Sequence, residues 1–270
     1  MSTQYGSTDE LQEARENIWK NEINEERNYQ LFDRLYILVQ ALMVLALALI
    51  ASWMGFYGEG IGFQAKQEFR WHPLLMSTAL LFINGEAILM YRGFRFQRKV
   101  YTKTIHASIQ ACGVILMLLG LKAVYDTHSL KNFASVHSWV GLLAMGLYAF
   151  QWTMGFTFFV LPSVPVEWRK KALPPHRLTG MIIFLVAAFA SLMGVTEFSA
   201  WSMTCWTEKN ELCTEMLVAN VFALVIVSYA ATVLFLVSNP FWARQPLPSE
   251  SEEAPVYSHD PLNKRLVKDK

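Results

Sequence analysis

The chain has 270 residues, of which 53% are hydrophobic and only 17% are charged, and its mean hydropathy is +0.25. A typical soluble domain carries roughly 25% charged residues, so this composition excludes an ordinary soluble protein and indicates a membrane protein. The net charge of +1 carries no information as a total, and no nucleic-acid partner is expected. Three cysteines are too few for a disulfide scaffold, and no C-x-x-C pair is present.

In chain order, the sequence predicts six membrane-spanning helices and no separate soluble domain. A helix needs about 20 apolar residues to cross the hydrocarbon core of a bilayer. The predicted spans are residues 35–56, 72–91, 104–125, 136–161, 178–198 and 216–237. The fold class is therefore an all-α integral membrane protein, with residues 35–238 as the transmembrane domain. Residues 1–34 and 239–270 are polar tails, and the Pro-rich, charged C-terminal tail is expected to be disordered.

Basic residues are concentrated in two of the five loops, and this concentration predicts the orientation. Short cytosolic loops carry an excess of Lys and Arg. The two basic loops follow the second and fourth spans and contain Arg92, Arg95, Arg98, Lys99, Lys103 and then Arg169, Lys170, Lys171, Arg177. Both loops are therefore expected in the cytosol, and an even number of spans then places both termini there. The acidic loop before the last span is expected on the outer side.

Four histidines occupy matched positions near the ends of the four central spans: His72, His106, His137 and His176. The second and fourth spans enter the membrane from the outer side, so His72 and His137 share the outer depth. The third and fifth enter from the cytosol, so His106 and His176 share the inner depth. At about 1.5 Å per residue, a helical span keeps the two depths well apart. Ionisable residues inside spans are costly and usually mark function, so we expect a ligand role for the set.

Two histidines at each depth favour haem over zinc. Zinc sites usually have three or four protein ligands, often with Cys or carboxylate among them, and no H-E-x-x-H motif occurs. Two imidazoles from facing helices can hold a haem iron on both axial sides within an apolar helix bundle. Such an iron keeps no open position for a substrate, so the expected role is electron transfer between the two depths.

The motifs around these histidines resemble the cytochrome b561 family of ascorbate-dependent, two-haem membrane reductases. They are WHPLLM, NGEAILMYR, KTIHASIQ, NFASVHSWVGL, FQWTMGF and PPHRLTG, and they follow the family's order within residues 35–240. The resemblance implies a central four-helix bundle with two b-type haems, the outer one between His72 and His137 and the inner one between His106 and His176. It also implies that cytosolic ascorbate reduces the inner haem, and that the outer haem passes the electron to monodehydroascorbate or ferric iron.

Candidate substrate residues follow from the resemblance together with the charge pattern. Lys99 and Lys103 are four residues apart, so they share a face if the third helix begins early. With Arg92, they are expected to bind the ascorbate anion on the cytosolic side. A basic cytosolic loop is also what orientation alone predicts, so charge by itself does not decide their role. On the outer side, the resemblance marks His128 and Phe133 as residues near the electron acceptor.

Three further residues carry separate expectations. Glu86 is the one acid deep within a predicted span, and hydrogen bonding to Asn84 or to a neighbouring helix is favoured over a role in proton transfer. Cys205 and Cys213 lie on the outer side, which is expected to be oxidising, so the sequence is consistent with a disulfide between them.

Two other functions stay open at this point: a metal-ion carrier with the histidines as transit sites, and a non-catalytic haem subunit of a larger redox complex. The wide apolar gap between the two depths argues against the carrier, and the basic cluster near the inner pair argues against the subunit. The stretch YQLF at residues 29–32 resembles an endocytic sorting motif, which favours an endosomal, lysosomal or secretory-vesicle membrane over the plasma membrane. The oligomeric state, including a homodimer, is left open.

Overall fold

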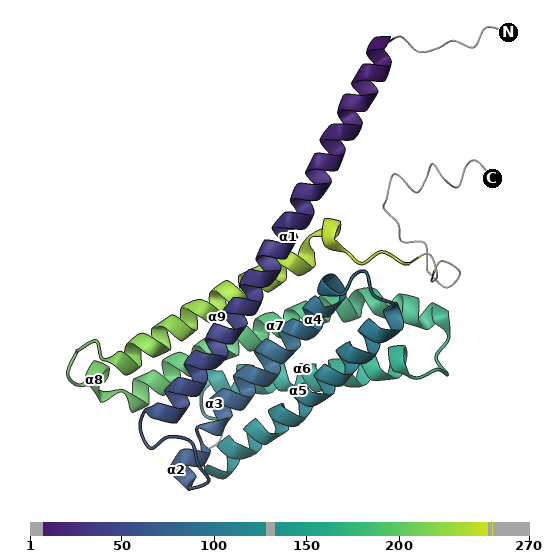
Figure 1. Ribbon diagram of the computed structural model, residues 1–270. Coiled ribbons are helices and arrows are strands. Elements are labelled where there is room, and N and C mark those ends of the chain that lie inside the picture. The colour runs from purple at the N-terminus through teal and green to yellow at the C-terminus, as the bar shows by residue number, and fades with distance from the viewer. Residues whose placement is uncertain (1–7, 128–132, 248–249, 251–270) are drawn as a thin grey trace, which may run out of the picture.

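The fold is built from helices alone over the residues that the computed structural model describes, which are 8–127, 133–247 and 250. Most of the long helices run nearly side by side, and the first one crosses them and extends well beyond them (Figure 1). Six helical segments in this described part are long and apolar enough to cross a bilayer. They are Gln12–Phe56, Trp71–Gly93, Lys99–Thr127, Val136–Val160, Val166–Ser202 and Thr214–Ser238. The prediction of an all-α membrane protein with six spanning helices is confirmed.

The helices follow one another along the chain with short connections. Their bounds are α1 Thr8–Phe56, α2 Ala65–Glu68, α3 Trp71–Met76, η1 Ser77–Ile83, α4 Asn84–Gly93, α5 Lys99–Thr127, α6 Val136–Gly155, η2 Phe156–Val160, α7 Val166–Ser202, α8 Thr204–Thr207, α9 Thr214–Ser238 and η3 Pro240–Trp242. The second span consists of α3, η1 and α4, and the fourth consists of α6 and η2. Both η1 and η2 are π-helical, a rare geometry that is frequent at functional sites.

Three helices begin earlier than hydropathy predicts. The first begins at Thr8 instead of residue 35, α5 at Lys99 instead of residue 104, and α7 at Val166 instead of residue 178. The added turns are rich in Glu, Gln, Lys and Arg, which are good helix formers, so the helices continue into water beyond the apolar core. Pro174 and Pro175 lie inside α7. The carbonyls that they leave without a donor belong to the exposed first turns, where water can replace the missing bonds.

The four histidine-bearing spans form the centre of the bundle. The chain packs α3 against α5, α5 against α6 and α6 against α7, and α7 returns to contact η1 and α4. Helices α1 and α9 pack together along one side of this group, where α9 also contacts α4 and α7. The larger hydrophobic core lies on that side, and a smaller one, around Met117, Tyr148 and Ile183, lies between η1, α5, α6 and α7.

The two ends of the bundle differ in charge. We call the first the α8 end: it comprises the 57–70 connection, α8 and the start of α9, and it carries Glu59, Glu208, Glu211 and Glu215. We call the other the basic end: it comprises the end of α4, the start of α5 and residues 161–177, which together hold most of the loop Lys and Arg residues. This asymmetry is the basis for assigning the ends to the two sides of a membrane.

The chain just after the last span folds back onto the first helix. The side chain of Trp242 is buried, its indole N–H donates to the Asn28 carbonyl at 3.1 Å, and its ring meets that of Phe32 at 5.5 Å. Residues 239–242 are therefore packed against the bundle and are not a free tail. Phe32, the last residue of YQLF, is buried within α1, so the structure adds no support for a sorting role of that stretch.

We predict that Gly85→Ala destabilises the protein. An added Cβ would lie 2.3 Å from the Tyr229 hydroxyl and 3.1 Å from the ring of Phe184, both fully buried. Overpacking of this kind typically costs about 1–3 kcal/mol. Gly146→Ala on α6 is the matched control, because nothing lies within 4 Å of its added Cβ. Thermal unfolding of both variants in detergent should show a lower midpoint for Gly85→Ala alone; equal midpoints would contradict the tight packing of α4.

Candidate functional site

The structure brings the four histidines together as two pairs of rings. The ring centres of His72 and His137 are 6.1 Å apart, with an interplanar angle of 87°. Those of His106 and His176 are 6.3 Å apart, with an angle of 72°. These are the two pairs that the direction of the spans predicts, one between α3 and α6 and one between α5 and α7.

The distance within each pair suits one metal ion between two imidazoles. A bond from a metal ion to an imidazole nitrogen is about 2 Å long and the nitrogen lies about 1 Å from the ring centre, so two rings on opposite sides of an ion have centres about 6 Å apart. Both observed distances match this value. Among the described residues, no group of three or more His, Cys, Asp or Glu side chains could hold a metal ion, so each pair fits a centre that takes only two protein ligands.

Three of the four rings are oriented by a hydrogen bond to the backbone of a neighbouring helix. Nδ1 of His72 donates to the Gly120 carbonyl at 3.0 Å, and Nδ1 of His137 donates to the Ala190 carbonyl at 2.9 Å. Nδ1 of His106 donates to the Ala87 carbonyl at 2.7 Å. A hydrogen bond at one ring nitrogen is the usual second contact of a histidine that binds metal through the other, because it fixes the tautomer and the ring direction.

The accepting carbonyls belong to small residues on helices that also carry a histidine. Fourteen residues separate His106 from Gly120 along α5, which is close to four turns and puts both on one face. The same spacing separates His176 from Ala190 along α7. Each of these helices thus presents a histidine at one depth and an accepting carbonyl at the other.

The second span follows the same plan with one extra residue. Fifteen residues separate His72 from Ala87, and the π-helical η1 lies between them. A π turn contains more residues than an α turn, so η1 accommodates the extra residue and keeps both groups facing the bundle centre. The sequence interpretation missed these carbonyls; the recurrence of Gly or Ala about four turns after a histidine is the signal that could have found them.

Glycines make room for two of the rings. A Cβ on Gly194 would lie 2.8 Å from Cε1 of His137, and a Cβ on Gly155 would lie 3.0 Å from Cε1 of His176. The His106–His176 pair also has aromatic neighbours, since Phe159 lies 5.1 Å from the ring of His176 and Tyr91 lies 5.6 Å from that of His106. These contacts restrict each ring from the sides.

The two pairs lie far apart along the bundle. Fourteen residues of α5 between His106 and the Gly120 carbonyl correspond to about 21 Å along the helix. A polar group lies between the two depths: the Gln110 amide donates to Asn84 Oδ1 at 3.0 Å, and the Tyr148 hydroxyl donates to Gln110. Nδ2 of Asn84 is buried without a hydrogen-bond partner in the described part of the chain.

Lys103 lies close to the His106–His176 pair at the basic end, and Lys99 lies one turn before it. Lys99 is the first residue of α5, so the early start of this helix places Lys103 one turn later and about one turn before His106. Nζ of Lys103 donates to the Phe159 carbonyl at 3.2 Å. The backbone N–H of Lys99 donates to the carboxylate of Glu250 at 2.6 Å. Lys103 is thus close to the C-terminal end of η2, and Lys99 is close to the C-terminal segment of the chain.

Two more charged groups at this end take part in contacts with the C-terminal part of the chain. The guanidinium of Arg92 donates to the Asn239 carbonyl at 2.7 Å and to the Val237 carbonyl, at the C-terminus of α9. Burial opposes ionisation of Glu250, but the hydrogen bonds from Lys99 and Arg244 outweigh it and keep the pKa of this carboxyl below its ordinary value. Arg92 therefore has a structural contact that the sequence interpretation did not include.

The predicted outer residues are only partly described. His128 lies outside the described residues. Phe133 is 43% exposed and has a positive φ of 63°, which places it in the turn that leads into α6. Cys205 and Cys213 form a disulfide that links α8 to the start of α9.

Glu86 is fixed by neighbouring helices and not by Asn84. The amide of Gln40 in α1 donates to both carboxylate oxygens at 3.1 and 2.9 Å, and the hydroxyl of Tyr229 in α9 lies 3.4 Å from one of them. This arrangement matches the expectation of hydrogen bonding to a neighbouring helix, because a polar group inside a membrane needs a protein partner.

Comparison with known proteins agrees with this geometry. Residues 71–202, which contain all four histidines, match the family model described as eukaryotic cytochrome b561. A Caenorhabditis elegans homolog of the transmembrane ascorbate-dependent reductase CYB561 is 34% identical over 241 residues, which cover 84% of this chain and 91% of the worm protein. The chain belongs to the cytochrome b561 family. The human family member CYB561, a transmembrane ascorbate-dependent reductase, is 34% identical over 81% of this chain and 86% of its own length. The Xenopus laevis plasma membrane ascorbate-dependent reductase CYBRD1 is 33% identical over 78% of this chain and 77% of its own length.

Membership of the cytochrome b561 family implies that the chain binds haem b. The described residues fit such a group: each depth offers two imidazoles at the spacing of one metal ion, and glycines leave room beside the rings. A doubly ligated haem iron needs only these two protein ligands. The ligand role of the individual histidines stays a prediction.

We predict that Gly194→Ala lowers haem content. The new methyl group would lie 2.8 Å from Cε1 and 3.4 Å from Nε2 of His137, so the ring would have to move away from its partner. The haem-to-protein ratio of the purified variant should fall while its helical circular dichroism is retained. Gly146→Ala, on the exposed face of the same helix and with nothing within 4 Å of its added Cβ, should keep the full haem content. Equal haem content in both variants would contradict a ligand role for His137.

Proposed function

We propose that this protein transfers electrons across a membrane from ascorbate to an acceptor on the opposite side. The support comes from two histidine pairs about 21 Å apart, at the two depths of a six-span bundle, together with relatives named ascorbate-dependent reductases. This spacing covers most of a hydrocarbon core of about 30 Å. The single observation that carries the proposal is the presence of two pairs instead of one.

The proposed orientation places the basic end in the cytosol. The connections at this end carry most of the loop Lys and Arg residues, as cytosolic loops do. Both chain termini then lie on the cytosolic side, and the α8 end with its disulfide faces an oxidising compartment, where disulfides persist. Monodehydroascorbate and ferric iron are the proposed acceptors at that end.

Two haem b groups are proposed, one held by His72 with His137 and the other by His106 with His176. When bound, each group would supply a one-electron redox centre without an open coordination position. The chain's own contribution is to orient the ligands: the carbonyls of Gly120, Ala190 and Ala87 accept from Nδ1 and direct Nε2 toward the partner ring.

The basic end is proposed to bind the donor through Lys103 and Lys99. Ascorbate is an anion at neutral pH, so a cationic surface raises its local concentration. Lys103 is one turn from His106, and its ammonium lies against Phe159, whose ring contacts His176. Arg92 is proposed to contribute positive charge while it also holds the end of α9. The proton that ascorbate loses on oxidation would be released to the cytosol.

We expect His106→Ala to remove one of two haems. The inner pair would lose a ligand and the outer pair would keep both of its own, so the haem-to-protein ratio should fall from about two to about one. Quantitative pyridine haemochrome assays on purified protein measure this ratio. Ascorbate should reduce the haem of the wild type in an absorption spectrum and should reduce that of the variant far more slowly. Haem that is present but insensitive to ascorbate would instead favour the non-catalytic subunit.

Lys103→Ala should slow reduction by ascorbate without loss of haem. Loss of one charge beside a binding site for an anion is expected to lower the apparent second-order rate by roughly three- to tenfold at low ionic strength, and added salt should reduce the difference. Stopped-flow reduction measures this rate. Lys170→Ala is the matched control, since Lys170 lies at the same end on the exposed start of α7. If the two variants are reduced at the same rate, Lys103 is not part of the donor site.

A further inference from the structure

The carboxylate of Glu250 lies at the basic end among groups that donate hydrogen bonds to it. The backbone N–H of Lys99 donates at 2.6 Å and that of Leu247 at 3.2 Å. The guanidinium of Arg244 donates to both carboxylate oxygens, at 2.8 and 2.7 Å. The side chains of Arg244 and Glu250 are only 10% and 18% exposed. Charged and backbone donors around one carboxylate form an anion-binding arrangement, and here a side chain of the same chain supplies the anion.

These hydrogen-bonding groups belong to the surface where ascorbate is proposed to bind. Lys99 is the first residue of α5, so its N–H lies at the positive end of the helix dipole. The charge of Arg244 acts on the hydroxyl of Tyr91, and the ring of Tyr91 lies 5.6 Å from that of His106. Glu250 therefore brings a negative charge onto the cationic surface that the proposed function assigns to an anion.

The segment that carries Glu250 is anchored close to the same end of the bundle. The chain leaves α9 after Ser238, and the side chain of Trp242 is buried against α1. Glu250 follows Trp242 by only eight residues, so its carboxylate stays within reach of Lys99 after its hydrogen bonds break. A group on so short a tether has a high effective concentration, which lets a weak contact compete with a soluble ligand.

We propose that Glu250 competes with ascorbate for the cationic surface at the basic end, so that the C-terminal segment regulates access of the electron donor. The proposal rests on the proposed function and adds to it a closed state, which Glu250 fills, and an open state, which ascorbate can enter. Ascorbate carries its negative charge on oxygen atoms, as a carboxylate does, so the same groups can donate to either anion. When the open state is only partly populated, the apparent affinity for ascorbate falls in proportion.

Replacement of Glu250 should therefore tighten the apparent binding of ascorbate. Stopped-flow reduction of the full-length, haem-loaded protein in detergent, over a series of ascorbate concentrations, gives a half-saturating concentration and a limiting rate. Glu250→Gln loses the charge that Arg244 pairs with, so the half-saturating concentration should fall by roughly three- to tenfold. The limiting rate should stay near that of the wild type. A purely structural role of Glu250 would not improve affinity at a constant limiting rate.

Glu167→Gln is the matched control, because it removes the same charge from the exposed first turn of α7 at the same end. Its half-saturating concentration should stay near that of the wild type. An unchanged or higher value in Glu250→Gln overturns the proposal, as does an equal fall in Glu167→Gln. If ascorbate reduces the wild type at no concentration, the proposed electron transfer fails, and the competition fails with it.

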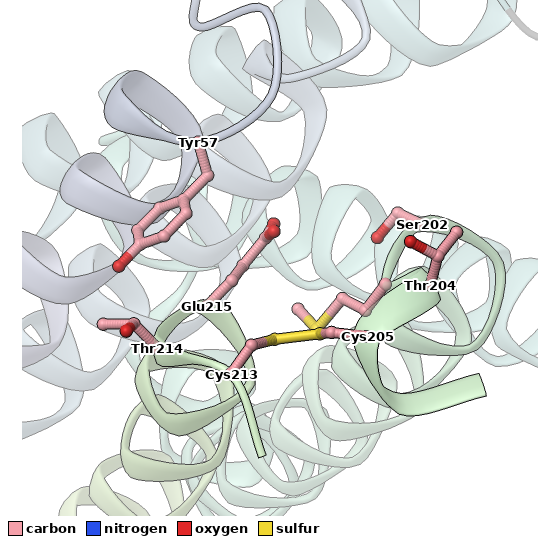
Figure 2. A pocket seen from close by; sticks show the side chains of 8 residues that line it. Tyr57, Ser202, Thr204, Cys205, Cys213, Thr214 and Glu215 are labelled. Carbon is pink, nitrogen blue, oxygen red and sulfur yellow. A yellow bond between two sulfur atoms is a disulfide. The ribbon is translucent and has the colours of Figure 1, made fainter. Parts of the chain in front are cut away.

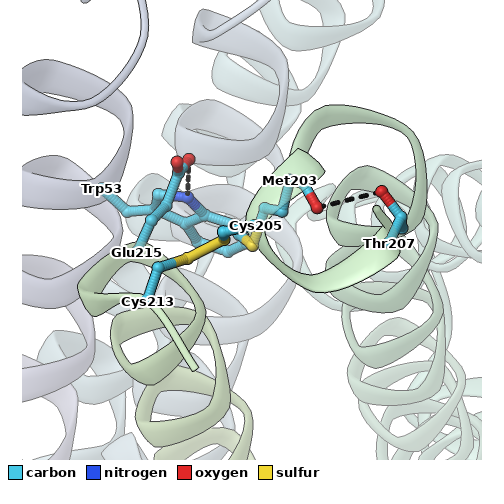
Figure 3. Close-up of a disulfide and its surroundings, with 6 residues drawn as sticks. All are labelled: Trp53, Met203, Cys205, Thr207, Cys213 and Glu215. Atoms are coloured by element: carbon cyan, nitrogen blue, oxygen red, sulfur yellow. Dashed lines mark hydrogen bonds between the residues drawn. A yellow bond between two sulfur atoms is a disulfide. The ribbon is translucent and has the colours of Figure 1, made fainter. Parts of the chain in front are cut away.

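A second control lies at the α8 end of the bundle. The indole N–H of Trp53 donates to the Glu215 carboxylate at 3.0 Å, beside the Cys205–Cys213 disulfide (Figure 3). This carboxylate lines an open cavity of about 390 Å³, together with Tyr57 (Figure 2). Glu215→Gln removes a partnered carboxylate at the opposite end from Lys99, so its ascorbate kinetics should match those of the wild type. A fall as large as that in Glu250→Gln would reveal a general effect of charge and would contradict local competition.

Discussion

Three hydrogen bonds between histidine rings and backbone carbonyls organise the centre of this protein. In each, a ring nitrogen donates to the carbonyl of a neighbouring helix at 2.7–3.0 Å. At Gly120 the helices α3 and α5 are also in close contact, because an added Cβ would lie 3.2 Å from Cβ of Leu75 and from Cγ of Met76. The accepting residues Gly120, Ala87 and Ala190 therefore belong to the site together with the histidines. The tautomer and direction of the rings follow from these contacts.

The same bonds join the two depths of the bundle. Helix α5 carries His106 at one depth and the Gly120 carbonyl at the other, and α7 repeats this arrangement with His176 and Ala190. A shift of one helix along its axis would therefore disturb both pairs at once. In the second span, the spacing between His72 and Ala87 is one residue longer than in α5 and α7. The π-helical η1 accommodates this extra residue.

The peripheral helices α1 and α9 stabilise the central helices through polar contacts inside the membrane. Gln40 of α1 and Tyr229 of α9 both reach Glu86 of α4, so a carboxyl group that would be costly in lipid instead joins three helices. At the basic end, Arg92 joins α4 to the last carbonyls of α9. These contacts secure the helix that carries the Ala87 carbonyl.

The sequence by itself determined the six spans and which histidines form a pair, because hydropathy and the alternating direction of successive spans are properties of the chain alone. Only the tertiary structure decided the early starts of α1, α5 and α7, the partners of Glu86 and Arg92, and the carbonyls that orient the rings. It also brought Tyr57, Ser202 and Glu215 to one cavity from three separate elements. These features depend on the rotation and register of packed helices, which contacts between distant residues fix and local patterns do not encode.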